Sequence, residues 1–189
     1  MNRQEIKVLG FSGSLRRGSF NKALVHHAIR LAPSYIKIEY FDLSRIPLFN
    51  EDVRIENGEP EAVKLFKDKI RESDALLIAV TEYNYSLSGV LKNAIDWASR
   101  PIDTSPLNEK PFAMMSAGGG LGGARAQYHM RQIAVFTNMH PLNKPELLIP
   151  RASEVFDNEG NLLDQKYDGR ISGLLDSLYN WTIRLKETR

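Results

Sequence analysis

The stretch that follows the first apolar run gathers groups that bind anions. From Phe11 to Leu24 the sequence reads FSGSLRRGSFNKAL, with serine hydroxyls, an asparagine amide and two adjacent arginines. Glycines let backbone N–H groups turn inward, and a helix that starts directly afterwards presents its positive end to the same place. Arg16 can add a charge-assisted hydrogen bond, so this chemistry suits a phosphate group. The alternative is a plain turn in which Ser19 caps the helix.

The spacing of the glycines in this loop distinguishes between kinds of phosphate-binding site. Gly13 and Gly18 have the spacing of a Walker A loop, but Ser19 stands where that loop needs a lysine. The dinucleotide fingerprint G-x-G-x-x-G is absent from this loop. Hydroxyls without the lysine favour a single terminal phosphomonoester.

A second stretch, Thr81–Gly89, reads TEYNYSLSG after an apolar strand. Two tyrosines and an asparagine are unusual for a mere turn. They can lie against a flat heteroaromatic ring and form hydrogen bonds with its edge.

The two stretches GSLRRGSFN and EYNYSLSGVLKNAIDW together resemble the NADPH-dependent FMN reductase family, which has the flavodoxin-like fold. The nearest branch is that of the bacterial quinone, chromate and azo-dye reductases, and the resemblance thins after about Pro150. It implies FMN as cofactor and NAD(P)H as co-substrate, with hydride transfer to the flavin. Two electrons then pass to a quinone, an azo compound, a metal oxyanion or free flavin.

The resemblance also implies which residues bind FMN. The first loop holds the phosphate, the second lines the ring, and a third loop covers the pyrimidine side. The implied cofactor-binding residues are Ser12, Ser14, Leu15, Arg16, Ser19, Phe20, Asn21, Glu82, Tyr83, Asn84, Tyr85, Ser116, Gly118, Gly119 and Gly120. No catalytic residue is predicted, because FMN carries the chemistry, and no metal site is expected.

Two residues depart from the family pattern. The family usually has proline at the positions of Thr81 and Ser88. Because proline fixes φ and stiffens a loop, their loss suggests a more mobile ring-binding loop and weaker retention of FMN.

The third loop, Gly118–Gly123, reads GGGLGG and contains the letters of G-x-G-x-x-G. It follows the fourth predicted strand rather than the first, which makes a pyrophosphate site the less favoured interpretation. The favoured one is a loop that approaches the flavin closely and offers N–H groups to negative charge on the reduced ring.

The elements that position these loops alternate between strand and helix, which predicts a doubly wound α/β sandwich. The resemblance makes it a flavodoxin-like three-layer sandwich, with a five-stranded parallel sheet in the order 2-1-3-4-5 and helices on both faces. The predicted strands are Ile6–Phe11, Ile36–Phe41, Ala75–Val80, Pro111–Ser116 and Glu146–Pro150. The predicted helices are Ser19–Leu31, Pro60–Ser73, Ser88–Ser99, Gly123–Phe136 and Gln165–Lys186. The longest irregular stretches, 42–59, 100–110 and 151–164, are too short to separate domains, so residues 1–189 are expected to form one domain.

Composition excludes several functions. The 189 residues contain no cysteine, which removes disulfides and thiolate metal sites, and the formal net charge of +2 is too balanced for a nucleic-acid partner. No apolar run reaches the roughly 18 residues that span a bilayer, and no signal-peptide pattern is visible, so a cytoplasmic protein without a membrane partner is expected.

An electron carrier of the flavodoxin kind remains an alternative, although such carriers are usually acidic and this chain has a pI near 8.8. A flavin-binding module without turnover and a dehydrogenase without flavin also stay open.

Self-association is also predicted. The helix around LKNAIDWA carries apolar residues on more than one side, which is more than one sheet face can cover. The resemblance likewise implies a homodimer or homotetramer.

Overall fold

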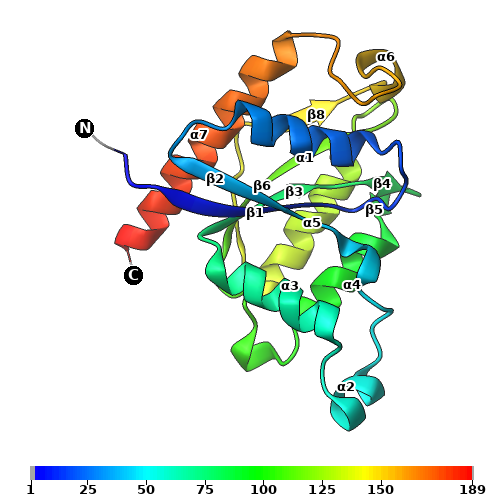
Figure 1. Ribbon diagram of the computed structural model, residues 1–189, viewed down its shortest axis with the longest axis vertical. Coiled ribbons are helices and arrows are strands. Elements are labelled where there is room, and N and C mark those ends of the chain that lie inside the picture. The colour runs from blue at the N-terminus through cyan, green and yellow to red at the C-terminus, as the bar shows by residue number, and fades with distance from the viewer. Residues whose placement is uncertain (1–2, 189) are drawn as a thin grey trace.

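The computed structural model describes residues 3–188 and has three layers, with a parallel sheet between helices (Figure 1). The strands lie in the order β2–β1–β3–β6–β7, and β8 also pairs with β6. They are β1 (Ile6–Ser12), β2 (Ile36–Phe41), β3 (Ala75–Ala79), β6 (Pro111–Ala117), β7 (His140–Pro141) and β8 (Leu147–Ile149). The predicted order is confirmed, because β7 and β8 both lie beside β6, in the fifth position.

Two hydrophobic cores hold the layers together. Helices α1 (Phe20–Leu31) and α7 (Lys166–Glu187) cover one face of the sheet. The other face is covered by α3 (Glu61–Glu72), α4 (Gly89–Ala98) and α5 (Ala124–Thr137). Side chains alternate along a strand, so β1 sends Ile6 and Val8 into the first core and Leu9 and Phe11 into the second. Strand β3 is buried along its whole length, as its continuous apolar run predicts.

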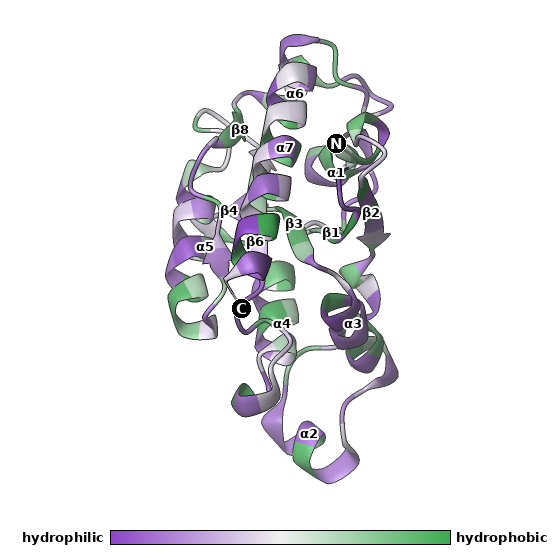
Figure 2. Ribbon diagram, turned by 90° about the vertical axis from the view of Figure 1, so that its left-hand side faces the viewer, coloured by the Kyte–Doolittle hydropathy of each residue, from purple (hydrophilic) through white to green (hydrophobic). Residues whose placement is uncertain are grey.

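The structure also contains short elements that the sequence pattern missed. They are α2 (Glu51–Asn57), α6 (Ala152–Val155), the two-residue strands β4 (Glu82–Tyr83) and β5 (Ser86–Leu87), and the 3₁₀ turns Leu43–Arg45 and Ile102–Thr104. Helix α2 projects from one end of the molecule (Figures 1 and 2) and has no buried residue. A helix without a buried face has no apolar periodicity to detect.

The prediction of an uncovered apolar face on α4 is wrong. All five of its apolar residues named by the pattern are buried within the chain: Leu91, Ala94, Ile95, Trp97 and Ala98. The segment before α2 covers the side of α4 that the sheet does not. There the indole N–H of Trp97 donates to the Pro47 carbonyl (2.8 Å), and the Phe49 ring packs edge-on against the indole at 5.0 Å.

Candidate functional site

Three loops meet at the carboxyl ends of β1, β3 and β6, where parallel sheets of this kind bind ligands. The first loop leads from β1 into α1. The β4–β5 hairpin follows β3, and the glycine loop leads from β6 into α5 (Figure 1).

Side-chain hydrogen bonds tie the three loops to one another. The Asn21 amide donates to the Ala117 carbonyl and accepts from the Ala117 N–H, both at 2.9 Å, which joins the first helix to the end of β6. The Ser88 hydroxyl donates to the Gly13 carbonyl (2.5 Å), which joins the start of α4 to the first loop. Glu82 in the hairpin accepts from the N–H of Ala126 in the first turn of α5 (3.2 Å). Asn21, a predicted cofactor residue, therefore has a structural task as well.

The first loop is held in place by short-range contacts. The Ser19 hydroxyl accepts from the Lys22 N–H (3.2 Å), so this serine caps α1 as the alternative interpretation also expected. The Ser14 hydroxyl lies within 3.4 Å of the Arg16 N–H. Ser14 and Ser19 are buried, whereas the Arg16 side chain is exposed at the edge of the loop. The loop thus offers backbone N–H groups, hydroxyls and one cation around the amino end of a helix.

Two other predicted residues of this loop differ in their surroundings. The Phe20 ring stacks on Phe156 with 5.3 Å between ring centres, and the Arg16 guanidinium lies 5.3 Å from the Phe20 ring centre. Phe20 thus packs within the protein. Leu15 is 53% exposed and can contact a ligand only by covering it from outside.

The hairpin carries the exposed aromatic groups of the site. Tyr83, Asn84 and Tyr85 are exposed, and the latter two have φ of +49° and +65°. Positive φ at both central residues is the backbone of a tight two-residue hairpin, but tyrosine rarely adopts it. Arg125 lies over the Tyr85 ring, with its Cζ 3.8 Å from the ring centre, and its guanidinium is 3.7 Å from the Glu82 carboxylate. The strained turn is therefore supported from α5.

Ser116 is completely buried beneath the glycine loop. Its hydroxyl donates to the Gly122 carbonyl (2.6 Å) and accepts from the side-chain amide of Gln127 (2.8 Å). This predicted cofactor residue therefore shapes the loop from below.

The three predicted glycines of this loop are not equivalent. The Gly118 N–H donates to the Ile149 carbonyl (3.1 Å), so it is already engaged. Within residues 3–188 the N–H groups of Gly119 and Gly120 have no hydrogen-bond partner, and both residues are exposed. The N–H groups of Gly119 and Gly120 are therefore available to a ligand.

Two glycines outside the predicted cofactor set are required by the fold. Gly122 and Gly123 have φ of +61° and +87°. A Cβ on Gly122 would lie 2.9 Å from the backbone of Ile149, and one on Gly123 would lie 2.6 Å from Ser116 Cβ. Gly123, the last glycine of the G-x-G-x-x-G letters, is therefore required for packing against the chain itself.

Unpaired polar atoms are concentrated at this end of the sheet. In the described part of the chain, the buried side-chain polar atoms without a hydrogen bond are Ser12 Oγ, Thr81 Oγ1 and Gln127 Oε1. Burial raises the pKa of Tyr40 and the neighbouring Ser12 hydroxyl opposes that shift, although the two form no hydrogen bond of normal geometry. A buried polar group without a partner costs free energy, so these atoms fit a site whose ligand supplies hydroxyl and phosphate groups.

Ser88, one of the two residues that replace family prolines, makes contacts that proline could not make. The Ser88 N–H donates to the Thr81 carbonyl (3.0 Å), and the Ser88 hydroxyl accepts from the Leu91 N–H (3.3 Å) and caps α4. The change from proline has therefore not simply removed a constraint from this segment.

Two kinds of feature are absent from residues 3–188. No group of three or more histidine or acidic side chains is arranged there to hold a metal ion. None of the described helices combines the length and the apolar character that crossing a membrane requires.

Known proteins resemble this chain along nearly all of its length. The family model described as NADPH-dependent FMN reductase matches residues 6–154. An NAD(P)H-dependent FMN reductase of Pseudomonas aeruginosa is 54% identical over 183 residues, which cover 96% of this chain and 98% of that protein. An NAD(P)H:quinone oxidoreductase of Solanum tuberosum is 44% identical over 186 residues, with 96% and 95% covered. Among solved structures, FerB, a flavoenzyme NAD(P)H:(acceptor) oxidoreductase from Paracoccus denitrificans, has a TM-score of 0.85 at 30% identity, with 95% and 98% covered.

Proposed function

Because this chain belongs to the NADPH-dependent FMN reductase family, we propose that the three loops at the carboxyl end of its sheet bind FMN. The protein is an FMN-dependent NAD(P)H oxidoreductase that reduces small-molecule acceptors. Relatives named as quinone reductases or quinone oxidoreductases, at 37–45% identity, support quinones as the acceptor class. The observation that carries the binding site is the cluster of buried, unpaired polar atoms between these loops.

The phosphate of FMN is assigned to the first loop. The amino end of α1 and the exposed Arg16 supply positive potential there, and Ser12, Ser14 and Ser19 supply hydroxyl groups. Asn21 keeps α1 in register with β6 through its two hydrogen bonds to Ala117, and its second amide hydrogen is left to donate to the phosphate.

The flavin ring is assigned to the space between the hairpin and the glycine loop. The exposed side chains of Tyr83, Asn84 and Tyr85 supply aromatic and amide contacts, and Glu82 holds the hairpin against α5. The free N–H groups of Gly119 and Gly120 can donate to the ring edge, where negative charge accumulates on reduction.

When bound, FMN supplies the redox chemistry, because it takes a hydride from NAD(P)H and passes two electrons to an acceptor. The residues of the chain have to bind the cofactor, orient it and leave one face of the ring open to both substrates. We assign no catalytic acid or base among them.

Anaerobic addition of NADPH to the FMN-loaded protein tests this function. We expect the flavin absorbance to bleach within seconds and to return when a quinone is added, and steady-state rates to follow ping-pong kinetics. Absorbance that persists with both NADPH and NADH would favour an electron carrier or a flavin-binding module instead.

We further propose that the chain assembles with copies of itself, as the resemblance implied. The exposed apolar surface that supports this lies on α5, where Tyr128, Val135 and Phe136 are 72%, 83% and 66% exposed. Light scattering of the purified protein should give a dimer or tetramer mass, and Val135→Lys should lower it. A monomeric wild-type mass would contradict this proposal. A cytoplasmic location stays a prediction.

A further inference from the structure

Thr81 has a buried hydroxyl for which the protein supplies no partner. The residue is 6% exposed, and its Oγ1 makes no hydrogen bond. Two other buried threonines satisfy their hydroxyls within their own helices: Thr182 donates to the Leu178 carbonyl (2.7 Å), and Thr137 donates to the Ile133 carbonyl (3.1 Å). A valine would fill the same volume at position 81 without leaving a polar group unpaired.

The backbone fixes Thr81 against the first loop. Its carbonyl accepts from the Ser88 N–H (3.0 Å), and the preceding Val80 N–H donates to the Met115 carbonyl (2.8 Å). A Cβ built on Gly13 would lie 3.5 Å from Thr81 Cβ. Thr81 therefore cannot turn away from the loop without breaking the end of the sheet.

A second unpaired hydroxyl lies at the end of the neighbouring strand β1. Ser12, which is 2% exposed, is opposite Ala79 in the β1–β3 register, two residues before Thr81. Its Oγ also lacks a hydrogen bond. Two buried hydroxyls without partners on neighbouring strand ends match a ligand that both donates and accepts hydrogen bonds, as a chain of hydroxyl groups does.

The place of Thr81 along the chain distinguishes between the parts of FMN. It lies beside Gly13 of the loop assigned to the phosphate, and it directly precedes the hairpin assigned to the ring. The ribityl chain is the part of FMN that joins the phosphate to the ring. We propose that Thr81 is a cofactor-binding residue whose hydroxyl forms a hydrogen bond with a ribityl hydroxyl. This inference rests on the proposed FMN site, and Thr81 is not among the residues that the family resemblance implied.

Thr81→Val tests the inference, because it removes only the hydroxyl. We expect the Kd for FMN and the Kd for riboflavin to rise by the same factor, about three- to tenfold. The Kd for lumiflavin, which has no ribityl chain, should not change. The apoprotein should melt about 2–4 °C higher, because the unpaired hydroxyl is gone. Opposite effects on apoprotein stability and on cofactor affinity are the signature of a group kept for a ligand.

Two further variants serve as controls. Thr182→Val removes a buried hydroxyl that is bonded within α7, and it should leave all three flavin affinities unchanged. Thr81→Ser keeps the hydroxyl and should retain FMN affinity within about twofold, which separates the hydroxyl from the methyl group.

Three results would overturn the inference. The first is that Thr81→Val leaves the Kd values for FMN and riboflavin unchanged. The second is that only the affinity for FMN falls, which would assign the hydroxyl to the phosphate. The third is a lower melting temperature of the apoprotein, which would show that the hydroxyl stabilises the fold. Failure of the wild-type protein to bind FMN would refute the cofactor site itself and is thus a separate outcome.

Discussion

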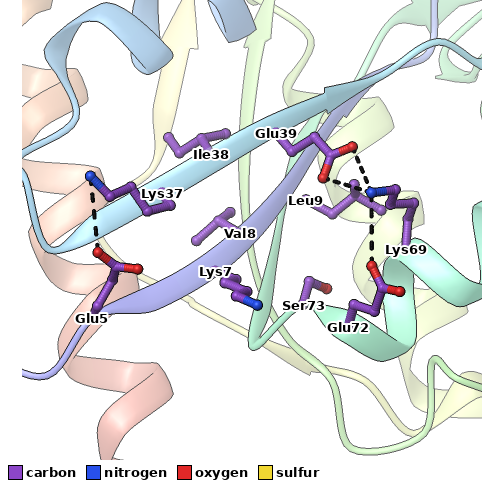
Figure 3. Close-up of a pocket in the computed structure, with 10 residues that line it drawn as sticks. All are labelled: Glu5, Lys7, Val8, Leu9, Lys37, Ile38, Glu39, Lys69, Glu72 and Ser73. Carbon is purple, nitrogen blue, oxygen red and sulfur yellow. Dashed lines mark hydrogen bonds and ion pairs between the residues drawn. The ribbon is translucent and has the colours of Figure 1, made fainter.

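The two ends of the central sheet differ in how their polar groups are satisfied. Over the first halves of β1 and β2, beside the last turn of α3, lies a hollow of about 350 Å³ (Figure 3). Five of the charged side chains that line it pair with one another: Lys37 with Glu5 (3.9 Å), and Lys69 with Glu39 (3.0 Å) and Glu72 (3.8 Å). At the carboxyl end, hydroxyls and an amide oxygen are buried without partners.

Hollows lie at both ends, since one of about 420 Å³ is lined by Arg16, Ser19 and Phe20 of the first loop, so it is unpaired buried polarity that distinguishes the carboxyl end. The ion pairs of the amino-end hollow are partly exposed to solvent, so their charges stay hydrated and a ligand has no desolvation cost to recover there. Buried polar atoms without partners have already lost their water, and a ligand that pairs them recovers that cost. We therefore expect substitutions at the two ends to separate cleanly in their effects.

The largest effect is expected from Gly123→Ala at the carboxyl end. The residue has a φ of +87°, and a Cβ would lie 2.6 Å from Ser116 Cβ. Left-handed strain and overpacking should together lower the free energy of unfolding by about 3–4 kcal/mol, measured by urea denaturation of the apoprotein. Gly119→Ala, where a Cβ meets open space, should change it by less than about 0.5 kcal/mol. Equal effects of the two variants would refute the account of this loop.

The next largest effect is expected from Asn21→Ala. Both hydrogen bonds to Ala117 are lost, so the free energy of unfolding should fall by about 2–3 kcal/mol. The first loop is then no longer held to β6, and the Kd for FMN should rise at least about tenfold. Calorimetric titration of the refolded variant with FMN measures the Kd. A Kd equal to that of the wild type would show that the two hydrogen bonds to Ala117 do not position the loop.

Ser88→Pro should have a smaller effect and tests the departure from the family pattern. Proline removes the N–H bond to the Thr81 carbonyl and the hydroxyl bond to the Gly13 carbonyl, so we expect a loss of about 1–2 kcal/mol in unfolding free energy and weaker FMN binding. Ser88→Ala keeps the N–H and should lose less unfolding free energy. If loop stiffness decided the affinity, Ser88→Pro and the double variant with Thr81→Pro would instead bind FMN more tightly. Comparing the Kd values for FMN shows whether the lost hydrogen bonds or the stiffness of the loop dominates.

The smallest effect is expected at the amino end. Hydrogen bonding to the Glu39 carboxylate raises the pKa of Lys69, so Glu39→Gln should lower that pKa toward its ordinary value. An NMR titration of the lysine measures the shift. The Kd for FMN should stay that of the wild type, and a weaker affinity would mean that the hollow in Figure 3 is coupled to cofactor binding.

The sheet could be predicted from the sequence because its central strands are short apolar runs. Strand β3 reads ALLIA and is buried on both faces, so no packing choice is left open. The sequence pattern predicts neither α2, which has no buried residue, nor the β4–β5 hairpin. Its turn places Tyr85 at positive φ, where hairpin signals normally show glycine. Helical periodicity predicts an uncovered apolar face on α4, and this is wrong because Pro47 and Phe49 cover it. These residues belong to a segment that has no periodicity of its own.

The loops of the site could be identified from residue types, but their internal bonding could not. Asn21 and Ala117 are 96 positions apart, so no local pattern shows that the asparagine amide is partly used within the protein. Which glycines are obligatory depends on what lies opposite them, and only the structure shows Ile149 and Ser116 there. From the sequence, Thr81 is only a residue that replaces a family proline. That its hydroxyl lacks a hydrogen-bond partner can be seen only when the positions of all its neighbours are known.

Hydrogen exchange of the apoprotein with and without FMN tests the central claim most directly, because it reports on both ends of the sheet in one experiment. We predict that FMN slows amide exchange in residues 12–21, 81–88 and 116–123 and leaves residues 5–9, 37–39 and 69–73 unchanged. Protection centred on the amino-end hollow, or exchange that FMN does not alter anywhere, would contradict the account.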